Sequence, residues 1–169
     1  MSTILYAQPY DISAEGFYFR SVEEYDRQAA GLKNEYGQPV EEFEIQFIDG
    51  ELIDCELAEA IGLNQVNFRH FYKLVNEWQD HEKTRFIIAV GECGYQFDLQ
   101  DDDIDQLDVD IYEEDSLKDL ALRFVEDGLF GEVPKAFEYY IDYDAIGRDL
   151  SADYSETTIA GNRLIYRCG

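Results

Sequence analysis

The sequence predicts an α+β fold with a highly acidic surface, and three observations lead to this prediction. Apolar residues make up 46% of the 169 residues and aromatic residues 15%, which is enough to bury a core. Some stretches alternate apolar and polar residues, as strands do, while others repeat apolar residues every three or four positions, as helices do. Thirty-eight acidic residues against thirteen basic ones give a formal net charge of −25.

Residues 1–53 are predicted to form a small N-terminal α+β domain. Apolar and polar residues alternate from Glu42 to Phe47, which is typical of a strand with one buried face. Further strands are expected near Ile4–Gln8 and Gly16–Phe19. The Asp49-Gly50 pair that follows the third strand is a hairpin-turn signal.

A helix is expected between the second and third of these strands. Ser21 followed by Glu24 fits a capping box at its start, and Gly37 supplies a stop at its end. The apolar side chains between them recur at a spacing of three to four and form one stripe: Val22, Tyr25, Ala29, Leu32 and Tyr36.

Residues 54–106 are predicted to form a mainly helical middle domain. Asp54 is expected to cap a short helix that Gly62 ends. A second helix is expected near Asn64–Asp80, with its aromatic residues on one side as core. The segment Arg85–Val90 is apolar but too short for periodicity to decide between a buried strand and a buried helix.

Residues 107–169 are predicted to form a C-terminal α+β domain with antiparallel strands. Asp108–Tyr112 is expected to be a strand, and Ser116 is expected to cap an amphipathic helix. Short helices are expected within residues 134–150. The last segment is typical of a hairpin that turns near Gly161-Asn162.

Negative charge is concentrated in two long intervals that contain no basic residue. No Lys or Arg lies between Lys33 and Arg69, or between Arg85 and Lys118. A solvated surface normally mixes both signs, so these intervals indicate a basic partner. The carboxylates expected to bind it collectively are Glu41, Glu42, Glu44, Asp49, Glu51, Asp54, Glu56, Glu59, Asp98, Asp101, Asp102, Asp103, Asp105, Asp108, Asp110, Glu113, Glu114 and Asp115.

The same charge argues against several partners and sites. Nucleic acid and anionic membranes are polyanions and would be repelled, and no apolar run is long enough to span a bilayer. Asp101, Asp103 and Asp105 match the start of a calcium loop. Gln106 and Tyr112, however, stand where that loop needs Gly and Glu, so the match fails.

No motif for catalysis, a metal or a cofactor stands out, so we expect no enzymatic activity, no bound metal and no cofactor. His70 and His81 are eleven residues apart and have no Cys partner in a zinc pattern. Cys55, Cys93 and Cys168 are far apart, and no secretory signal is visible. We therefore expect reduced thiols in a cytoplasmic protein.

The charge density of the chain is comparable with that of duplex DNA. Duplex DNA carries one negative charge per ~1.7 Å of its axis, so 25 charges match roughly 43 Å of duplex. A compact globule of this length would be about 40 Å across. Carboxylates held at fixed positions would then suit a basic DNA-binding groove, and the binding would weaken steeply as salt rises.

One C-terminal segment, Gly128–Leu150, carries a more specific pattern. Its elements are Gly131-Glu132-Val133-Pro134, Tyr140-Ile141-Asp142-Tyr143, Ala145 and Arg148-Asp149-Leu150. In order and spacing this pattern resembles the C-terminal region of the ArdA antirestriction proteins, which are acidic proteins carried by plasmids and conjugative transposons. The final RLIYRC and, more loosely, the stretch FIDGELI from Phe47 to Ile53 are also similar to that family.

The resemblance implies an elongated chain of three small domains and a homodimer joined through the C-terminal domains, curved and charged like bent DNA. It also implies inhibition of type I restriction-modification enzymes, by occupation of the DNA groove of their methyltransferase core. Two chains would match roughly 85 Å of duplex by the same charge density. The residues expected as core or dimer contacts are Phe130, Val133, Pro134, Phe137, Tyr140, Ile141 and Tyr143.

Other functions stay open from the residues alone. The acidic face could confer only solubility, or the chain could be an acidic adaptor or histone-type chaperone for basic proteins in general. A divalent-cation binder is a further alternative, since any dense carboxylate cluster attracts cations. Competition by duplex DNA on one specific enzyme would favour DNA mimicry over a general chaperone.

Overall fold

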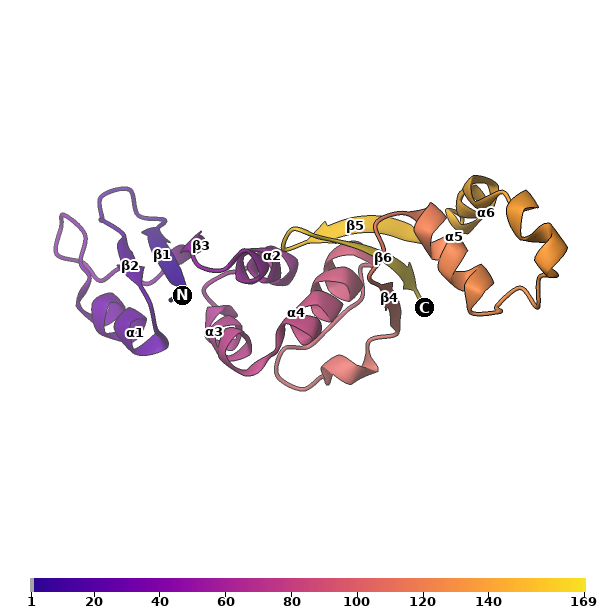
Figure 1. Ribbon diagram of the computed structural model, residues 1–169. Helices are drawn as coiled ribbons and strands as arrows, with labels where there is room; N and C mark the ends of the chain where they lie inside the picture. Colours follow the sequence, from indigo (N-terminus) through magenta and orange to yellow (C-terminus); the bar gives the residue numbers. More distant parts are fainter. Residues whose placement is uncertain (1) are drawn as a thin grey trace. The chain divides into compact units, whose positions relative to one another are not determined.

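The computed structural model describes residues 2–169, and the protein is of the mixed α+β class (Figure 1). The chain divides into two compact units, one ending at Gln106 and one running from Leu107 to Gly169. Each unit contains one three-stranded sheet. The arrangement in three domains, with a first boundary between residues 53 and 54, stays a prediction.

The sheet of the first unit has the strand order β2-β1-β3. It consists of β1 (Ile4–Pro9), β2 (Phe17–Phe19) and β3 (Phe43–Asp49), and both outer strands run antiparallel to β1. Phe43 and Ile45 are buried, as the alternation predicts, because every second side chain of a strand faces the same side. All three expected strands are present.

The Asp49-Gly50 pair does not form the predicted hairpin. Strand β3 is followed by helix α2 (Leu52–Ile61), and β3 pairs with β1 instead of with a following strand. Gly50 adopts φ +156°, and a Cβ atom there would lie 2.9 Å from the Phe47 ring. The chain bends at Gly50, and the apolar periodicity after it decides which element follows.

Helix α1 (Val22–Gly31) begins at the predicted cap and ends earlier than predicted. The Ser21 hydroxyl accepts a hydrogen bond from the backbone N–H of Glu24 at 3.1 Å. The helix stops well before Gly37 because Asn34 forms a turn of its own. The Asn34 Oδ1 atom accepts hydrogen bonds from the backbone N–H groups two and four residues later, at 2.9 and 3.0 Å, which competes with helix formation.

The middle of the first unit is helical, as predicted. Helix α2 ends at Gly62, which adopts the left-handed φ of +70° that favours glycine, but its N-cap is Glu51 and not Asp54. Helix α3 (Phe68–Glu77) is shorter than predicted. It starts late because the side chain of Asn64 accepts hydrogen bonds from backbone N–H groups two and three residues later and forms a turn.

The ambiguous apolar run is helical. Helix α4 (Asp80–Phe86) continues into the π-helix η1 (Ile87–Glu92), and residues 86–89 are buried. A short 3-10 turn, η2 (Ile104–Gln106), closes the first unit. A run that is buried on all sides carries no periodic signal, so only the preceding helical turn could indicate its conformation.

One aromatic core joins the first sheet to helices α1 and α3. The ring centroid of Phe68 lies 4.5 Å from that of Tyr25 and 5.5 Å from that of Phe19. The Tyr72 hydroxyl donates a hydrogen bond to the carbonyl oxygen of Phe19 at 3.1 Å, and burial raises the pKa of this tyrosine. Side chains from both sides of position 53 therefore share this core.

The sheet of the second unit has the strand order β4-β6-β5 and is antiparallel. Its strands are β4 (Val109–Tyr112), β5 (Ser155–Ile159) and β6 (Asn162–Cys168). Strands β5 and β6 form the expected hairpin. Its turn residues are Ala160 and Gly161, whose φ values of +50° and +82° suit a tight hairpin turn.

The helices of the second unit pack beside one another. Helix α5 (Leu117–Glu126) begins at the predicted cap Ser116, which accepts a hydrogen bond from the backbone N–H of Asp119 at 3.1 Å. The 3-10 helix η3 (Lys135–Tyr140) and helix α6 (Tyr143–Leu150) follow. The core of this unit contains Leu120, Phe124, Tyr154 and Ile165.

Candidate functional site

The first acidic segment, residues 41–59, holds most of its carboxylates on ordered backbone. Gln65 fixes the chain before β3, because its Nε2 atom donates to the carbonyl oxygen of Glu41 at 2.6 Å and its Oε1 atom accepts from the N–H of Phe43 at 2.9 Å. Glu56 is half-buried on α2. The exposed carboxylates of this segment are Glu41, Glu42, Glu44, Asp49, Glu51 and Glu59.

Asp54 does not belong to this exposed set. Its Oδ1 atom accepts a hydrogen bond from Lys83 Nζ at 2.7 Å, and the two side chains are 5% and 6% exposed. The expectation that Asp54 faces a partner is corrected, because its position on α2 points it toward α4 and into the protein. A buried carboxylate needs such a partner, since burial of an unpaired charge is costly.

The second acidic segment, residues 98–115, begins as a folded loop in the first unit. Asp98 Oδ1 accepts from the backbone N–H of Gln100 at 2.8 Å, and Asp102 Oδ2 accepts from the N–H of Asp98 at 2.7 Å. Ile104 is buried and anchors the loop. The carboxylates of this loop are exposed at Asp98, Asp101, Asp102, Asp103 and Asp105.

The rest of this segment lies in the second unit, where basic residues take up part of its charge. Arg167 Nη2 lies 2.7 Å from Asp110 Oδ2, and Arg123 Nη1 lies 3.4 Å from Glu114 Oε1. The hydrogen bond to Asp110 raises the pKa of Arg167. The exposed carboxylates here are Asp108, Glu113 and Asp115.

The segment expected to make core or dimer contacts borders a hollow in the second unit. The hollow has a volume of about 850 Å³ and is lined by Val133, Pro134, Ile141 and Tyr143, among others. Large apolar side chains of the same segment are exposed, with exposed fractions of 57% at Phe130, 59% at Phe137 and 83% at Tyr140. The Phe130 ring contacts the core residue Phe124, with the two ring centroids 6.5 Å apart, whereas Phe137 and Tyr140 are exposed. A contact of this segment with a second chain stays a prediction.

Three further features concern possible metal ligands, membrane-spanning helices and the cysteine thiols. Among residues 2–169, no group of three or more His, Cys, Asp or Glu side chains is arranged to hold a metal ion. In the same described range, no helix is both long and apolar enough to cross a membrane. Cys55 is a free thiol, as expected, whereas Cys93 and Cys168 are not free thiols, so the expectation of reduced cysteines is wrong for these two.

Several residues that pair with or position the carboxylates of the two acidic segments carry no signal in the local sequence. Lys83 and Arg167 neutralise carboxylates that lie 29 and 57 residues away, and Gln65 fixes a strand entry 24 residues away. Arg123 pairs with Glu114, which is nine residues away. Trp78, expected as helix core, instead follows the last turn of α3 and is only half-buried. Nothing in the local sequence marks any of these roles.

The comparison with protein families identifies the chain. A family model described as antirestriction protein (ArdA) matches residues 20–162. No curated protein matches the sequence. Because the matched range covers most of the 169 residues and includes both acidic segments, the chain belongs to the ArdA family of antirestriction proteins.

Proposed function

We propose that this antirestriction protein is a DNA mimic that acts without catalysis. Its two acidic segments would occupy the basic DNA-binding groove of the methyltransferase core of a type I restriction-modification enzyme and so block restriction. The observation that carries the proposal is that exposed carboxylates in both segments stand on ordered backbone, and not on a tail.

Order matters for mimicry because the phosphates of a duplex are fixed relative to one another. In the loop of the second acidic segment, the carboxylates of Asp98, Asp102 and Asp103 accept backbone N–H groups at 2.7 to 3.0 Å. A side chain held in this way loses less conformational entropy when it binds. The carboxylates can therefore meet a basic groove at little entropic cost.

The internal ion pairs decide which carboxylates present the charge. The net charge of −25 already counts every basic residue, so the pairs do not lower it. They do remove Asp54 from the surface and engage Asp110 and Glu114. The exposed acids of residues 41–59 and 98–115 are thus the best candidates for contact with the target.

We further propose that two chains associate through the second unit. The motivating feature is the exposed apolar set Phe130, Phe137 and Tyr140, which would otherwise contact water. Two chains would carry twice the charge and match roughly 85 Å of duplex at one charge per ~1.7 Å.

The deciding experiment is a binding measurement against a purified type I methyltransferase core, at low and high salt, with and without duplex DNA. A DNA mimic should bind with an affinity that falls steeply with salt, and DNA should displace it. Binding to histones and other basic proteins with equal affinity would favour the chaperone alternative. A tight, saturable calcium site in calorimetry would favour the cation-binder alternative.

A further inference from the structure

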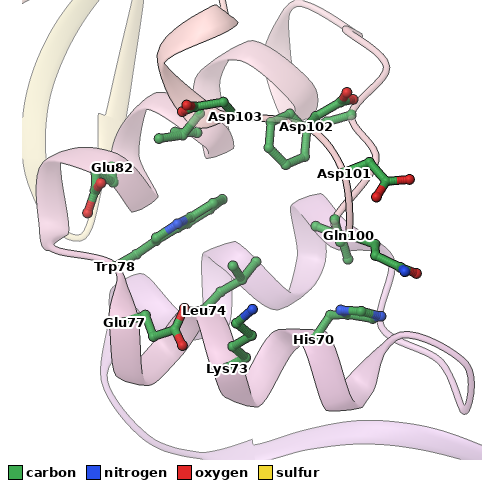
Figure 2. Close-up of a pocket in the computed structure, with 13 residues that line it drawn as sticks. His70, Lys73, Leu74, Glu77, Trp78, Glu82, Gln100, Asp101, Asp102 and Asp103 are labelled. Carbon is green, nitrogen blue, oxygen red and sulfur yellow. The ribbon is translucent and has the colours of Figure 1, made fainter.

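A pocket of the first unit lies between helix α3, the start of α4 and the loop of the second acidic segment. Its volume is about 340 Å³, at the lower end of the range of roughly 300–1,000 Å³ that is typical of small-ligand sites. Figure 2 shows the Trp78 indole extending into this space. His70 and Lys73 lie on the α3 side, and residues 101–103 lie on the opposite side.

Trp78 is held in place and yet remains accessible. Its backbone N–H donates to the carbonyl oxygen of Leu74 at 2.8 Å. Its ring centroid lies 5.6 Å from that of Phe86 and 6.2 Å from that of Phe97, while the side chain is only half-buried. An indole that is packed against two rings but open to a pocket offers π surface to a ligand.

The pocket lining is strongly negative. One ammonium group, that of Lys73, stands against five carboxylates, so the lining is negative by four charges with the histidine neutral. Three of the carboxylates each use one oxygen to accept a backbone N–H, which fixes the group and leaves the other oxygen for a ligand. The five carboxylates are Glu77, Glu82, Asp101, Asp102 and Asp103.

We propose that this pocket receives an arginine side chain of the basic partner, with its guanidinium stacked on Trp78 and hydrogen-bonded to carboxylates of the loop. A planar guanidinium is weakly hydrated, stacks on aromatic rings and pairs with carboxylates, whereas a lysine ammonium is a compact, strongly hydrated charge. The inference rests on the proposed function, since it names the chemistry that the second acidic segment would recognise.

An arginine pocket at Trp78 predicts an effect that binding through summed charge alone does not predict. If only summed charge mattered, a substitution that leaves every charge in place would not affect affinity. We expect Trp78→Leu to weaken binding to a purified type I methyltransferase core about tenfold, because aromatic anchors in pockets dominate interfaces. The slope of log affinity against log salt should stay unchanged, since no ionic contact is removed.

Two matched variants complete the test. Tyr36→Leu removes an aromatic side chain that is 77% exposed and outside the pocket, and it should leave affinity unchanged. Trp78→Phe keeps an aromatic ring against Phe86 and Phe97, and it should retain more affinity than Trp78→Leu. If Trp78→Leu and the parent bound the methyltransferase core with equal affinity, the proposed arginine site would be wrong, and the proposed function would be unaffected.

A second measurement tests the pocket without the enzyme. Trp78 is the only tryptophan of the chain, so its fluorescence reports on the pocket. Acetyl-arginine-amide should change the Trp78 emission saturably, and acetyl-lysine-amide should do so more weakly. Replacing Asp101, Asp102 and Asp103 with Asn should reduce the arginine response severalfold.

The two measurements separate the two proposals. Failure of the parent protein to bind the methyltransferase would count against the proposed function. In that case, a saturable response to the arginine compound would still support an arginine pocket. An equal response to both compounds, or no response to either, would overturn the arginine pocket.

Discussion

Lys83 Nζ lies 2.7 Å from Asp54 Oδ1, and both side chains are buried within the first unit. This ion pair joins helix α2 to helix α4. Breaking a buried pair leaves an uncompensated charge inside the protein, which typically costs about 3–5 kcal/mol, whereas replacing both partners with apolar residues is often neutral.

We therefore expect Lys83→Met to lower the free energy of unfolding by about 3–5 kcal/mol. The double variant Asp54→Leu/Lys83→Met should recover most of this loss. Urea unfolding followed by Trp78 fluorescence measures the first unit directly. The control Glu59→Gln, at an exposed position of the same helix, should change stability by less than about 0.5 kcal/mol. A loss at Lys83→Met no larger than that of the control would contradict this role of the pair.

The loop of the second acidic segment should matter more for inhibition than net charge alone. Replacing Asp101, Asp102, Asp103 and Asp105 with Asn removes four exposed charges, while the amide oxygens can still accept backbone hydrogen bonds. We expect this variant to fold normally and to inhibit a type I enzyme at least tenfold less well. Restriction of unmodified DNA, assayed over a range of inhibitor concentrations, provides the measurement.

A charge-matched control separates position from net charge. It replaces four exposed acids outside both acidic segments with their amides: Glu15, Glu23, Asp149 and Asp153. This control should inhibit nearly as well as the parent. If both four-charge variants lost the same activity, total charge would govern inhibition and the assignment of the site would fail.

The exposed apolar side chains of the second unit should control oligomeric state. Phe137→Glu/Tyr140→Glu places two carboxylates in the proposed dimer contact, where their desolvation is unfavourable. We expect a parent mass of two chains and a variant mass of one in sedimentation equilibrium. Tyr10→Glu alters a tyrosine of the first unit that is 65% exposed, and it should leave the dimer intact. A monomeric parent, or a variant that remains dimeric, would contradict the proposed interface.

Two helical glycines should respond oppositely to alanine. Alanine normally stabilises a helix by roughly 1 kcal/mol relative to glycine. At Gly147 of helix α6, however, a Cβ atom would lie 3.2 Å from backbone atoms of Leu117 and Lys118. We expect Gly147→Ala to lower the thermal midpoint of the second unit because the backbone of α5 would have to move.

Gly31→Ala is the matched control, since a Cβ atom at the last residue of α1 would meet nothing within 4 Å. It should leave stability unchanged or raise it. Differential scanning calorimetry of the two variants gives the comparison. An increase in the midpoint for Gly147→Ala would show that α5 and α6 are packed less tightly than their backbone distance indicates.

The Cys55 thiol should react slowly. Burial raises its pKa, and the nearby carboxylates of Glu59 and Glu56 raise it further, because both effects disfavour the thiolate. At a pH below this raised pKa the thiolate fraction is smaller than in an unfolded chain, so alkylation by iodoacetamide should be slower. Glu59→Gln should speed it, whereas Glu44→Gln should not. Peptide mapping by mass spectrometry follows this cysteine alone, and equal rates in folded and unfolded protein would refute the shift.

The sequence by itself determined the features that depend on a few neighbouring residues. Ser21 and Ser116 cap their helices as predicted, and Gly62 ends α2, because each of these groups bonds to backbone within one turn. The alternation of apolar and polar residues that predicted the strand at β3 is likewise a pattern of neighbouring residues. The errors at the end of α1 and the start of α3 were also local, since Asn34 and Asn64 form competing turns.

Only the tertiary structure decided which acids remain available. In sequence, Asp54 and Asp110 lie in intervals without a base, yet Lys83 and Arg167, 29 and 57 residues away, neutralise them in space. The same holds for the pocket beside Trp78, whose walls come from separate segments of the first unit. Charge patterns along a chain set the total field, but the distance between two charged groups depends on how the backbone folds, and ionic attraction falls with that distance.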